Sequence, residues 1–302
     1  MDRRISGSTQ LLGLIGDPVV HSLSPAMHNA ALAAMGEDYC YVPFPVAAER
    51  LAVAVAGLAA IGVRGFNVTI PHKQAILPLL SQVEARAAKV GAVNTVYALP
   101  EGGWGGTNTD IDGFVQPLLG LEKGIPTLIL GCGGAARAAI QGCLELELGP
   151  VRVAGRSPEK LQALQQTWPQ VETLSWAELD RHLPETSLVV NTTPVGMYKP
   201  GSPAELSPLS REQLRLLPAG AVVYDLIYVP DPTPLLRMAA ALGHTPISGL
   251  EMLIHQGAKA LSLWLGGKPV PVEVMRQAAR QQLAQIEADR ARDPKPQLSS
   301  QS

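Results

Sequence analysis

Short apolar segments alternate with longer segments of helical periodicity along most of the chain. The apolar runs 11–16, 39–46 and 65–70 are bounded by glycine, proline or polar residues, as buried strands commonly are. Between them, 24–36 and 49–62 have the apolar spacing of helices, and 24–36 begins with Ser-Pro and ends at glycine. This order predicts an α/β protein whose parallel sheets carry helices on both faces.

The same alternation continues through the rest of the chain. A strand pair joined by a glycine turn is predicted at 92–99 and 103–110, and Pro71 is expected to open a helix that runs to about Leu80. The other predicted strands are 127–132, 151–155, 187–193, 221–227 and 245–248. The other predicted helices begin at Gly134 and Ser157 or span 250–266 and 271–288. The composition of 289–302 favours a disordered tail.

Composition narrows the class of protein. A chain of 302 residues exceeds the usual size of one core, so two domains are expected. The net charge of −2 gives no reason to expect binding to nucleic acid or an anionic membrane. The three cysteines are widely spaced and predict a reducing compartment without a disulfide framework. The sequence shows no metal-ligand motif, signal-peptide core or membrane-length apolar run, so a soluble cytoplasmic protein is expected.

The segment 127–140, TLILGCGGAARAAI, predicts a dinucleotide site. A buried strand leads through a glycine turn into a helix, and Gly131, Gly133 and Ala136 fit the G-x-G-x-x-A fingerprint. The glycines allow a tight turn and close approach of a pyrophosphate, while the alanine lets the helix pack on the strand. The helix N-terminus would face the anion with free N–H groups. An ordinary glycine-rich turn between strand and helix is the alternative.

The tip of the next strand indicates which dinucleotide is bound. An NAD site usually carries an acidic residue there, but this strand ends in Gly155-Arg156-Ser157. Arg156 could hold a 2′-phosphate, with Ser157 adding a hydroxyl and Lys160 lying within one helical turn. Arg156 could instead be a solvated arginine, and Ser157 is expected to cap the next helix in either case. The sequence therefore favours NADP over NAD.

Polar side chains gather at strand ends in the first half of the chain. Asn67 and Thr69 point the same way because side chains alternate along a strand, and Lys73 follows within the first helical turn. Open α/β sheets bind their ligands at such strand ends. The other polar residues in comparable positions are Ser22, Ser24, Asn94 and Asp110. Together they suit a small polyhydroxylated ligand, whose carboxylate could bind the two serine hydroxyls at a helix N-terminus.

Each of these residues also has a structural explanation when it is taken alone. Ser24 is predicted to be the N-cap of the helix that continues at Pro25, and Asp110 could equally be the N-cap of the helix that follows it. Asn94 could cap or bridge a turn, and Lys73 could be a solvated helix lysine. The case for a ligand site therefore rests on the joint pattern.

Several stretches, spread over nearly the whole chain, occur in a characteristic order. They are GDPVVHSLSPAMHNAAL, GFNVTIPHK, GAVNTV, GTNTDIDGF, GCGGAARAA, GRS, NTTPVGM, YDLIY and GLEMLIHQGAKALSLW. With them the chain resembles the shikimate dehydrogenase family. The resemblance implies NADPH-linked reduction of 3-dehydroshikimate to shikimate, in the pathway to aromatic amino acids. It also implies an N-terminal α/β substrate domain (1–112), a Rossmann-type doubly wound NADP domain (113–249) and C-terminal helices (250–288) that pack back on the first domain.

The resemblance further implies which residues form the site. Lys73 and Asp110 match the catalytic pair of the family. The substrate site would contain Ser22, Ser24, Asn67, Thr69, Lys73, Asn94, Asp110, Tyr228 and Gln256. The cofactor site would contain Gly131, Gly133, Gly134, Ala135, Arg156, Ser157, Lys160, Thr192, Met197, Ile227 and Gly249. Gly155 stands where the family usually has asparagine at the 2′-phosphate, which leaves the strength of the NADP preference open but not its direction.

Two other functions stay open at this stage. One is a dehydrogenase of similar build with another or a broader substrate range, such as quinate, although an NAD-type acidic residue near 156 is absent. The other is a non-catalytic NADP-binding regulator, which would have no need of Lys73 and Asp110 together. The sequence leaves the oligomeric state open, a homodimer included.

Overall fold

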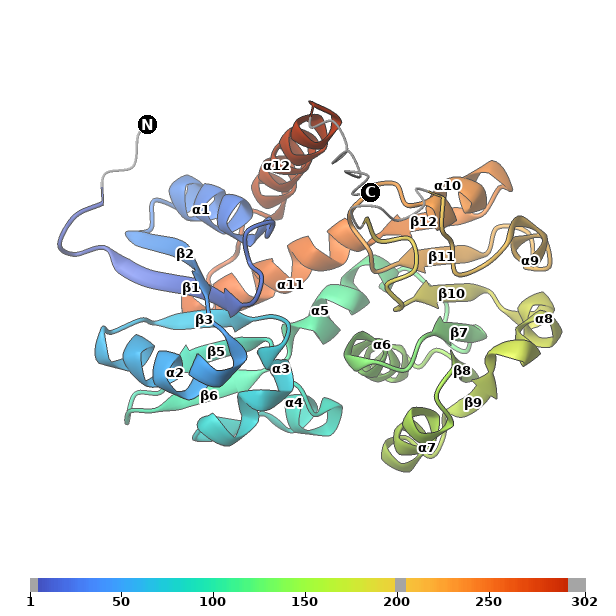
Figure 1. Ribbon diagram of the computed structural model, residues 1–302, viewed down its shortest axis with the longest axis horizontal. Helices are drawn as coiled ribbons and strands as arrows, with labels where there is room; N and C mark the ends of the chain where they lie inside the picture. The colour runs from blue at the N-terminus through green and yellow to red at the C-terminus, as the bar shows by residue number, and fades with distance from the viewer. Residues whose placement is uncertain (1–4, 199–204, 293–302) are drawn as a thin grey trace, which may run out of the picture.

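The computed structural model describes residues 5–198 and 205–292, and two sheets form its two lobes (Figure 1). The strands of the first lobe are β1 (Gln10–Gly16), β2 (Tyr39–Pro45), β3 (Gly65–Val68), β4 (Gln82–Val83), β5 (Thr95–Ala98) and β6 (Trp104–Thr107). Its helices are α1 (Ser24–Met35), α2 (Leu51–Ala60), α3 (His72–Ala75) and α4 (Ala85–Val90), with the 3₁₀ turns η1 (Ala48–Arg50) and η2 (Leu77–Leu79).

The chain passes to the second lobe through α5 (Thr109–Val115) and η3 (Gln116–Leu118). The strands there are β7 (Thr127–Leu130), β8 (Val151–Gly155), β9 (Glu172–Ser175), β10 (Leu188–Asn191), β11 (Val222–Asp225) and β12 (Thr245–Ser248). The helices between them are α6 (Gly134–Glu145), α7 (Pro158–Thr167), η4 (Trp176–Glu178), α8 (Leu179–His182), η5 (Leu183–Glu185), α9 (Arg211–Leu214) and α10 (Pro234–Ala241). The last two helices are α11 (Gly249–Trp264) and α12 (Val272–Arg292).

The first sheet is mixed rather than purely parallel. Its strands stand in the order β2-β1-β3-β5-β6-β4, and β5 is antiparallel to both of its neighbours. The cause is the tight connection between β5 and β6, where Gly102 and Gly103 have φ of +94° and +86°, values that favour glycine. The predicted strand pair is therefore confirmed, whereas the expectation of parallel sheets does not hold at β5.

The second sheet is parallel throughout and has the order β12-β11-β10-β7-β8-β9. The chain enters at β7, moves outward to β9 and then returns to β10 on the other side of β7. This doubly wound order opens a crevice outside the carboxyl ends of β7 and β10, where such sheets bind their ligands. The prediction of an α/β chain with a Rossmann-type second half is confirmed.

Some predicted boundaries differ from the structure. The sequence does not predict β4 or β9, since neither is an apolar run. The helix expected from Pro71 to Leu80 stops at Ala75, because Pro78 lacks the N–H that a continuing helix would use. At the other end α12 extends to Arg292, so the tail predicted from 289 was placed too early, and 293–302 lie outside the described residues.

An apolar cluster joins the two lobes. Ile111 and Phe114 of α5 are fully buried together with Ile129 of β7 and Ile140 of α6. The helices approach closely at Gly142, where a Cβ would stand 2.5 Å from the Phe114 ring. The lobes are therefore held by packed side chains as well as by the chain that connects them.

The last two helices return to the first lobe, as predicted. Leu261 of α11 and Met275 of α12 are buried in one cluster with Leu12 of β1 and Met27 of α1. Figure 1 shows α12 beside α1, and α11 running from the second lobe toward the first. The domain boundaries expected after 112 and 249 stay predictions. None of the described helices combines the length and the apolar character needed to cross a membrane.

Candidate active site

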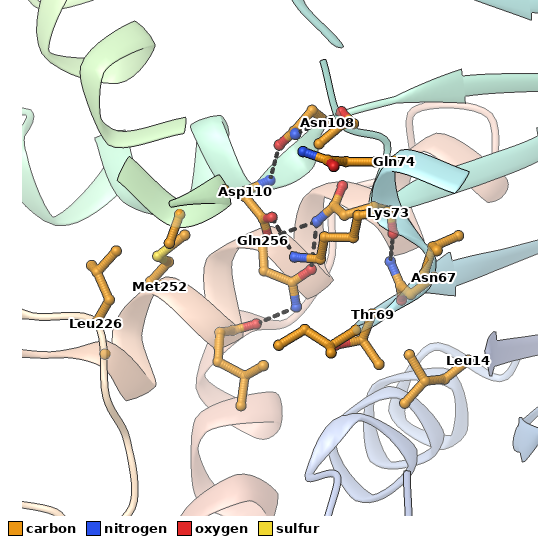
Figure 2. Close-up of a pocket in the computed structure, with 18 of the residues that line it drawn as sticks. Leu14, Asn67, Thr69, Lys73, Gln74, Asn108, Asp110, Leu226, Met252 and Gln256 are labelled. Carbon is orange, nitrogen blue, oxygen red and sulfur yellow. Dashed lines mark hydrogen bonds and ion pairs between the residues drawn. The ribbon is translucent and has the colours of Figure 1, made fainter. Parts of the chain in front are cut away.

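A cavity of about 490 Å³ lies between the lobes, at the ends of strands from both sheets (Figure 2). The predicted substrate residues that line it are Asn67, Thr69, Lys73, Asn94, Asp110, Tyr228 and Gln256. The predicted cofactor residues that line it are Gly134, Ala135 and Gly249. The structure therefore brings most of the predicted substrate site together with one part of the predicted cofactor site.

Lys73 and Asp110 form an ion pair in this cavity. The Lys73 Nζ donates to Asp110 Oδ2 at 2.6 Å, and the two side chains are 32% and 15% exposed. Lys73 lies in the first turn of α3. The neighbouring residue His72 is buried and anchors this helix, because its Nε2 donates to the Val46 carbonyl at 2.6 Å. The pair is thus partly withdrawn from water while Lys73 still faces the cavity.

Asp110 is not the N-cap of its helix, so that alternative is wrong. The N-cap of α5 is Asn108, whose side chain accepts from the Asp110 N–H at 3.1 Å. The carboxylate of Asp110 is therefore available to Lys73 and to a ligand. An asparagine immediately before a helix is a known start signal, so Asn108 could have been found from the sequence.

Asn94 ties three elements of the cavity wall together. Its Nδ2 donates to Asp110 Oδ1 at 2.7 Å and to Gln256 Oε1 at 3.3 Å, and its Oδ1 accepts from the Thr109 N–H at 2.7 Å. Gln256 in turn donates from Nε2 to the Leu253 carbonyl at 2.8 Å. The strand after α4, the start of α5 and the middle of α11 are held in one hydrogen-bonded arrangement.

Asn67 is held by a residue that the sequence analysis missed. The Tyr41 hydroxyl donates to Asn67 Oδ1 at 2.8 Å, while Asn67 Nδ2 donates to the Asn94 carbonyl and to Thr95 Oγ1. Burial raises the pKa of Tyr41, so its hydroxyl stays protonated and remains a donor. Tyr41 lies in an apolar strand, and only the pairing of β1 with both β2 and β3 places it near Asn67.

The ring of His28 packs under this arrangement without entering the cavity. It stacks on Tyr41 with ring centroids 4.1 Å apart, and its Nδ1 lies 2.8 Å from the Ser24 carbonyl. Burial lowers the pKa of His28 to about 4, so the ring is neutral near pH 7. His28 is therefore a packing residue at this site.

Ser22 and Ser24 do not lie among the residues that line the cavity. Helix α1 begins at Ser24 itself, and its N-cap, Leu23, makes no side-chain capping hydrogen bond. The prediction that Ser24 is the N-cap is therefore wrong, because the helix starts one residue earlier than expected. Instead the Ser22 Oγ accepts from the Ser24 N–H at 3.2 Å, which leaves the Ser24 hydroxyl free of that task.

The glycine loop after β7 has the form that a dinucleotide needs. Gly131 has φ of +109°, and a Cβ there would stand 2.6 Å from Thr192 Oγ1. No side chain caps α6, and nothing lies within 4 Å of where a Cβ at Gly133 or Gly134 would stand. Ala136 is fully buried where α6 packs on the sheet. The uncapped helix end and the open space beside it suit a pyrophosphate.

The residues expected at the 2′-phosphate lie at the tip of β8, away from the cavity lining. Ser157 caps α7, accepting from the Lys160 N–H at 3.4 Å, as predicted. Arg156 is exposed and borders a second groove with Pro158, Gln162, Gln165 and Trp176. Within the described residues neither Arg156 nor Lys160 forms an ion pair. Both cations are available to an anionic ligand.

The remaining predicted residues lie on the loops after β10 and β11. Thr192 donates from its hydroxyl to the Leu130 carbonyl at 2.7 Å, Met197 is 43% exposed and Ile227 is buried. Burial raises the pKa of Tyr228, so its hydroxyl stays protonated in the cavity. The lining residues that the sequence analysis did not name include Leu14, Gln74, Leu226, Met252 and Leu253.

Family models match two parts of the chain. That of the shikimate dehydrogenase substrate binding domain matches 14–96, and that of the shikimate 5′-dehydrogenase C-terminal domain matches 249–280. Shikimate dehydrogenase (NADP(+)) of Synechococcus sp. (strain JA-3-3Ab) is 94% identical over 286 residues, 95% of this chain and 98% of that protein. The chain belongs to the shikimate dehydrogenase family. The resemblance inferred from the sequence is confirmed.

Solved structures similar to this member of the shikimate dehydrogenase family share its fold. The shikimate 5-dehydrogenase of Thermus thermophilus, in complex with NADP(H) and shikimate, is 36% identical with a TM-score of 0.81, over 91% of this chain and 100% of its own. Quinate dehydrogenase of Corynebacterium glutamicum, in complex with NAD, is 30% identical with a TM-score of 0.80, over 90% of this chain and 99% of its own. The two correspond to the expected activity and to its alternative.

Proposed function

We propose that the chain catalyses the reversible, NADPH-linked reduction of 3-dehydroshikimate to shikimate, a step toward chorismate and the aromatic amino acids. The observation that carries the proposal is the Lys73–Asp110 pair, which lines the same cavity as Gly134 and Ala135 at the start of α6. A carbonyl reductase needs a proton donor and a dinucleotide site that meet in this way. The near-identical relative named for this activity supports the choice of substrate and cofactor.

The second lobe is the proposed NADP(H) site, where a bound nicotinamide would supply hydride to the ketone carbon. Gly131, Gly133, Gly134 and Ala135 would receive the pyrophosphate, since their helix end is uncapped and bordered by open space. Arg156 and Lys160, with the Ser157 hydroxyl, would bind the 2′-phosphate through charge-assisted hydrogen bonds. The residues proposed to complete the cofactor site are Thr192, Met197, Ile227 and Gly249.

Lys73 is the proposed proton donor. Negative charge develops on the ketone oxygen during reduction, and a donor within hydrogen-bond reach lowers that barrier. The Lys73 Nζ would give its proton to this oxygen and would take it back from the hydroxyl in the reverse direction. Asp110 Oδ2 accepts from the Lys73 Nζ at 2.6 Å, and Asp110 Oδ1 accepts from Asn94 Nδ2. The proton donor is therefore oriented before the substrate binds.

The substrate site is proposed to combine residues from both lobes. Asn67, Thr69 and Asn94 present amide and hydroxyl groups that suit the ring hydroxyls of the substrate. Tyr228 and Gln256 reach the same cavity from the second lobe and from α11. Ser22 and Ser24, which do not line the cavity, would bind the carboxylate at the N-terminus of α1. Closure of the lobes is proposed to bring these groups and the cofactor together.

A broader substrate range that includes quinate is the second candidate, favoured by the likeness to quinate dehydrogenase. Arg156 favours NADP over NAD as the cofactor, because an NAD site usually carries a carboxylate at that strand tip. A non-catalytic NADP-binding regulator is the least supported reading. It gives no role to the oriented Lys73–Asp110 pair.

The deciding experiment measures cofactor reduction with shikimate, quinate and related hydroxy acids, each with NADP and with NAD. We expect the highest kcat/KM for shikimate with NADP. Lys73→Ala should bind NADPH normally but lose turnover by roughly 10²–10⁴-fold, as removal of an acid–base group does. Lys89→Ala, at an exposed lysine of α4, is the matched control. Turnover of Lys73→Ala within a few-fold of the parent would exclude Lys73 as the proton donor.

The cytoplasm is the proposed location, since three cysteines without a disulfide framework suit a reducing compartment. Size-exclusion chromatography with light scattering, on the same preparation, measures whether the chain forms the homodimer that the sequence left open.

A further inference from the structure

A buried carboxylate lies at the end of β11, one residue before the loop that lines the cavity. Asp225 is the last residue of that strand, is 0% exposed and pairs in register with Asn191 of β10 and Ser248 of β12. It does not line the cavity, although the next residue, Leu226, does. The proposed mechanism gives Asp225 no task, so its burial needs an explanation.

The carboxylate is held by uncharged donors. Its Oδ1 accepts from Asn191 Nδ2 at 2.9 Å and from the Ile227 N–H at 3.1 Å, and its Oδ2 accepts from Thr233 Oγ1 at 2.7 Å. In the described part of the chain no lysine, arginine or histidine forms an ion pair with it. Burial raises the pKa of Asp225 to about 6. A buried acid without a cation is costly, and such groups concentrate at functional sites.

The three donors fix two separate loops. Ile227 and Thr233 belong to the loop after β11, which the carboxylate therefore holds at both ends. Asn191 belongs to β10, and its side chain continues into the loop after that strand. Its Oδ1 accepts from the Thr193 N–H at 3.0 Å and from Thr193 Oγ1 at 2.7 Å, while its Nδ2 donates to the Val195 carbonyl at 3.3 Å.

The loop after β11 supplies part of the cavity wall, and Asp225 ties the loop after β10 to it through Asn191. Leu226 and Tyr228 line the cavity, and Gly249 fits against the loop so closely that a Cβ there would stand 2.3 Å from the Leu226 carbonyl oxygen. Figure 2 shows Leu226 and Met252 on one side of the pocket and Leu14 on the other, with Lys73 between them. A shift of the loop after β11 would move Leu226 and Tyr228 and would change the shape of the cavity in which the proposed cofactor and substrate would meet.

From these contacts we infer that Asp225 is a positioning residue, which fixes the loops 192–197 and 226–233 relative to each other so that the cofactor's reactive ring faces the substrate. Asp225 does not line the cavity and acts through Asn191, Ile227 and Thr233. The inference rests on the proposed function, because the ring and the substrate are those of the proposed reaction. Reacting groups held within fractions of an ångström react far faster than loosely held ones.

The test compares Asp225→Ala with Asp225→Asn. Alanine removes the acceptor that three buried donors share, and of these only Asn191 Nδ2 keeps another acceptor, the Val195 carbonyl, so the loops should separate. Asparagine keeps an acceptor for Asn191 and Ile227, and its Nδ2 can donate to the Thr233 hydroxyl. We expect Asp225→Ala to raise KM for NADP roughly tenfold and to lower kcat by roughly 10–100-fold, the range for a misplaced reacting group. KM for shikimate should change less than threefold, and Asp225→Asn should restore most of the loss.

Further readouts separate positioning from stability and from the proposed function. The primary isotope effect with deuterated NADPH should increase in Asp225→Ala, because hydride transfer becomes slower than product release. NADPH affinity, measured by fluorescence without substrate, should fall even if the parent proves inactive on shikimate. The matched control is Asp231→Asn, which removes a part-exposed carboxyl from the same loop. Thr233→Val, which removes one donor, should show a smaller shift in the same direction if Asp225→Ala does not fold.

The inference is overturned by a folded Asp225→Ala whose NADPH affinity, kcat and isotope effect equal those of the parent, or by an Asp225→Asn as impaired as Asp225→Ala. Parent inactivity on shikimate, with reduced NADPH affinity in Asp225→Ala, would instead reject the proposed substrate and keep Asp225 as an organiser of the cofactor loops.

Discussion

Replacing Asp225 by asparagine should change how folding stability depends on pH. In the folded protein burial raises the pKa of this carboxyl from 3.8 to about 6. Between these values the folded chain holds a proton that the unfolded chain has released. Stability of the parent therefore falls as pH rises through this window and levels off above pH 6, where both states are ionised. Asparagine carries no such proton, so this decrease should be absent from Asp225→Asn.

The magnitude follows from the distance between the two pKa values. At about 1.4 kcal/mol for each pKa unit, the step from 3.8 to about 6 corresponds to about 3 kcal/mol. Part of this change in the free energy of unfolding occurs below pH 4.5, because the unfolded carboxyl is already mostly ionised at that pH. Between pH 4.5 and pH 7.5 the free energy of unfolding of Asp225→Asn should gain about 2 kcal/mol relative to the parent.

The assay is urea unfolding of both proteins at pH 4.5, 6.0 and 7.5, followed by tryptophan fluorescence. Other carboxyls contribute equally to both proteins, so the difference between the two stabilities isolates residue 225. Asp231→Asn controls for the loss of a negative charge in the same loop. A constant difference across the three pH values, or one that shrinks as pH rises, would refute the reasoning, because it would mean that the folded carboxyl ionises at its ordinary pKa or below it.

Two further substitutions test the loops and the cofactor preference. Gly249→Ala should lower the free energy of unfolding by roughly 1–3 kcal/mol and raise KM for NADP, because its Cβ would stand 2.3 Å from backbone that must then move. The control is Gly57→Ala at an exposed position of α2, where nothing lies within 4 Å; it should be neutral or stabilising by up to about 1 kcal/mol. Equal melting temperatures for the two variants would argue against the close contact. Arg156→Asp should lower kcat/KM for NADP at least roughly tenfold, because charge-assisted hydrogen bonds to the 2′-phosphate are lost. The kcat/KM for NAD should hold steady or rise, because a carboxylate can accept from a free 2′-hydroxyl. An unchanged ratio of the two kcat/KM values would remove Arg156 from the cofactor site.

Buried strands and their order along the chain were predictable because strands buried on both faces must be apolar throughout. The same reasoning failed at β9, an edge strand whose sequence is not an apolar run. Antiparallel β5 could have been inferred from its own glycine turn, since a hairpin reverses direction. Helix starts were uncertain by one residue, which was enough to assign the wrong role to Ser24.

The residues of the candidate site likewise fall into those that a local sequence pattern predicts and those that it does not. Asn67, Thr69 and Lys73 were predictable because strand alternation and one helical turn bring them together within seven residues. The roles of Tyr41, Asn191 and Asp225 were not predictable. Each lies within or at the end of an apolar strand, and its role depends on a hydrogen-bond partner on another strand. Register alone brings Asn191 beside Asp225, and no local pattern in the sequence fixes register.

The return of α11 and α12 to the first lobe has a consequence for how the protein is made. On a ribosome the residues of β1 and α1 emerge first, yet Leu12 and Met27 share their core with Leu261 and Met275. The second sheet, by contrast, is formed from one uninterrupted stretch between 127 and 248. The half that is synthesised first must therefore wait for the final segment of the chain, and the later half can complete its own sheet before it. A chain arrested after β12 should accordingly show a protected second sheet and a protease-sensitive beginning.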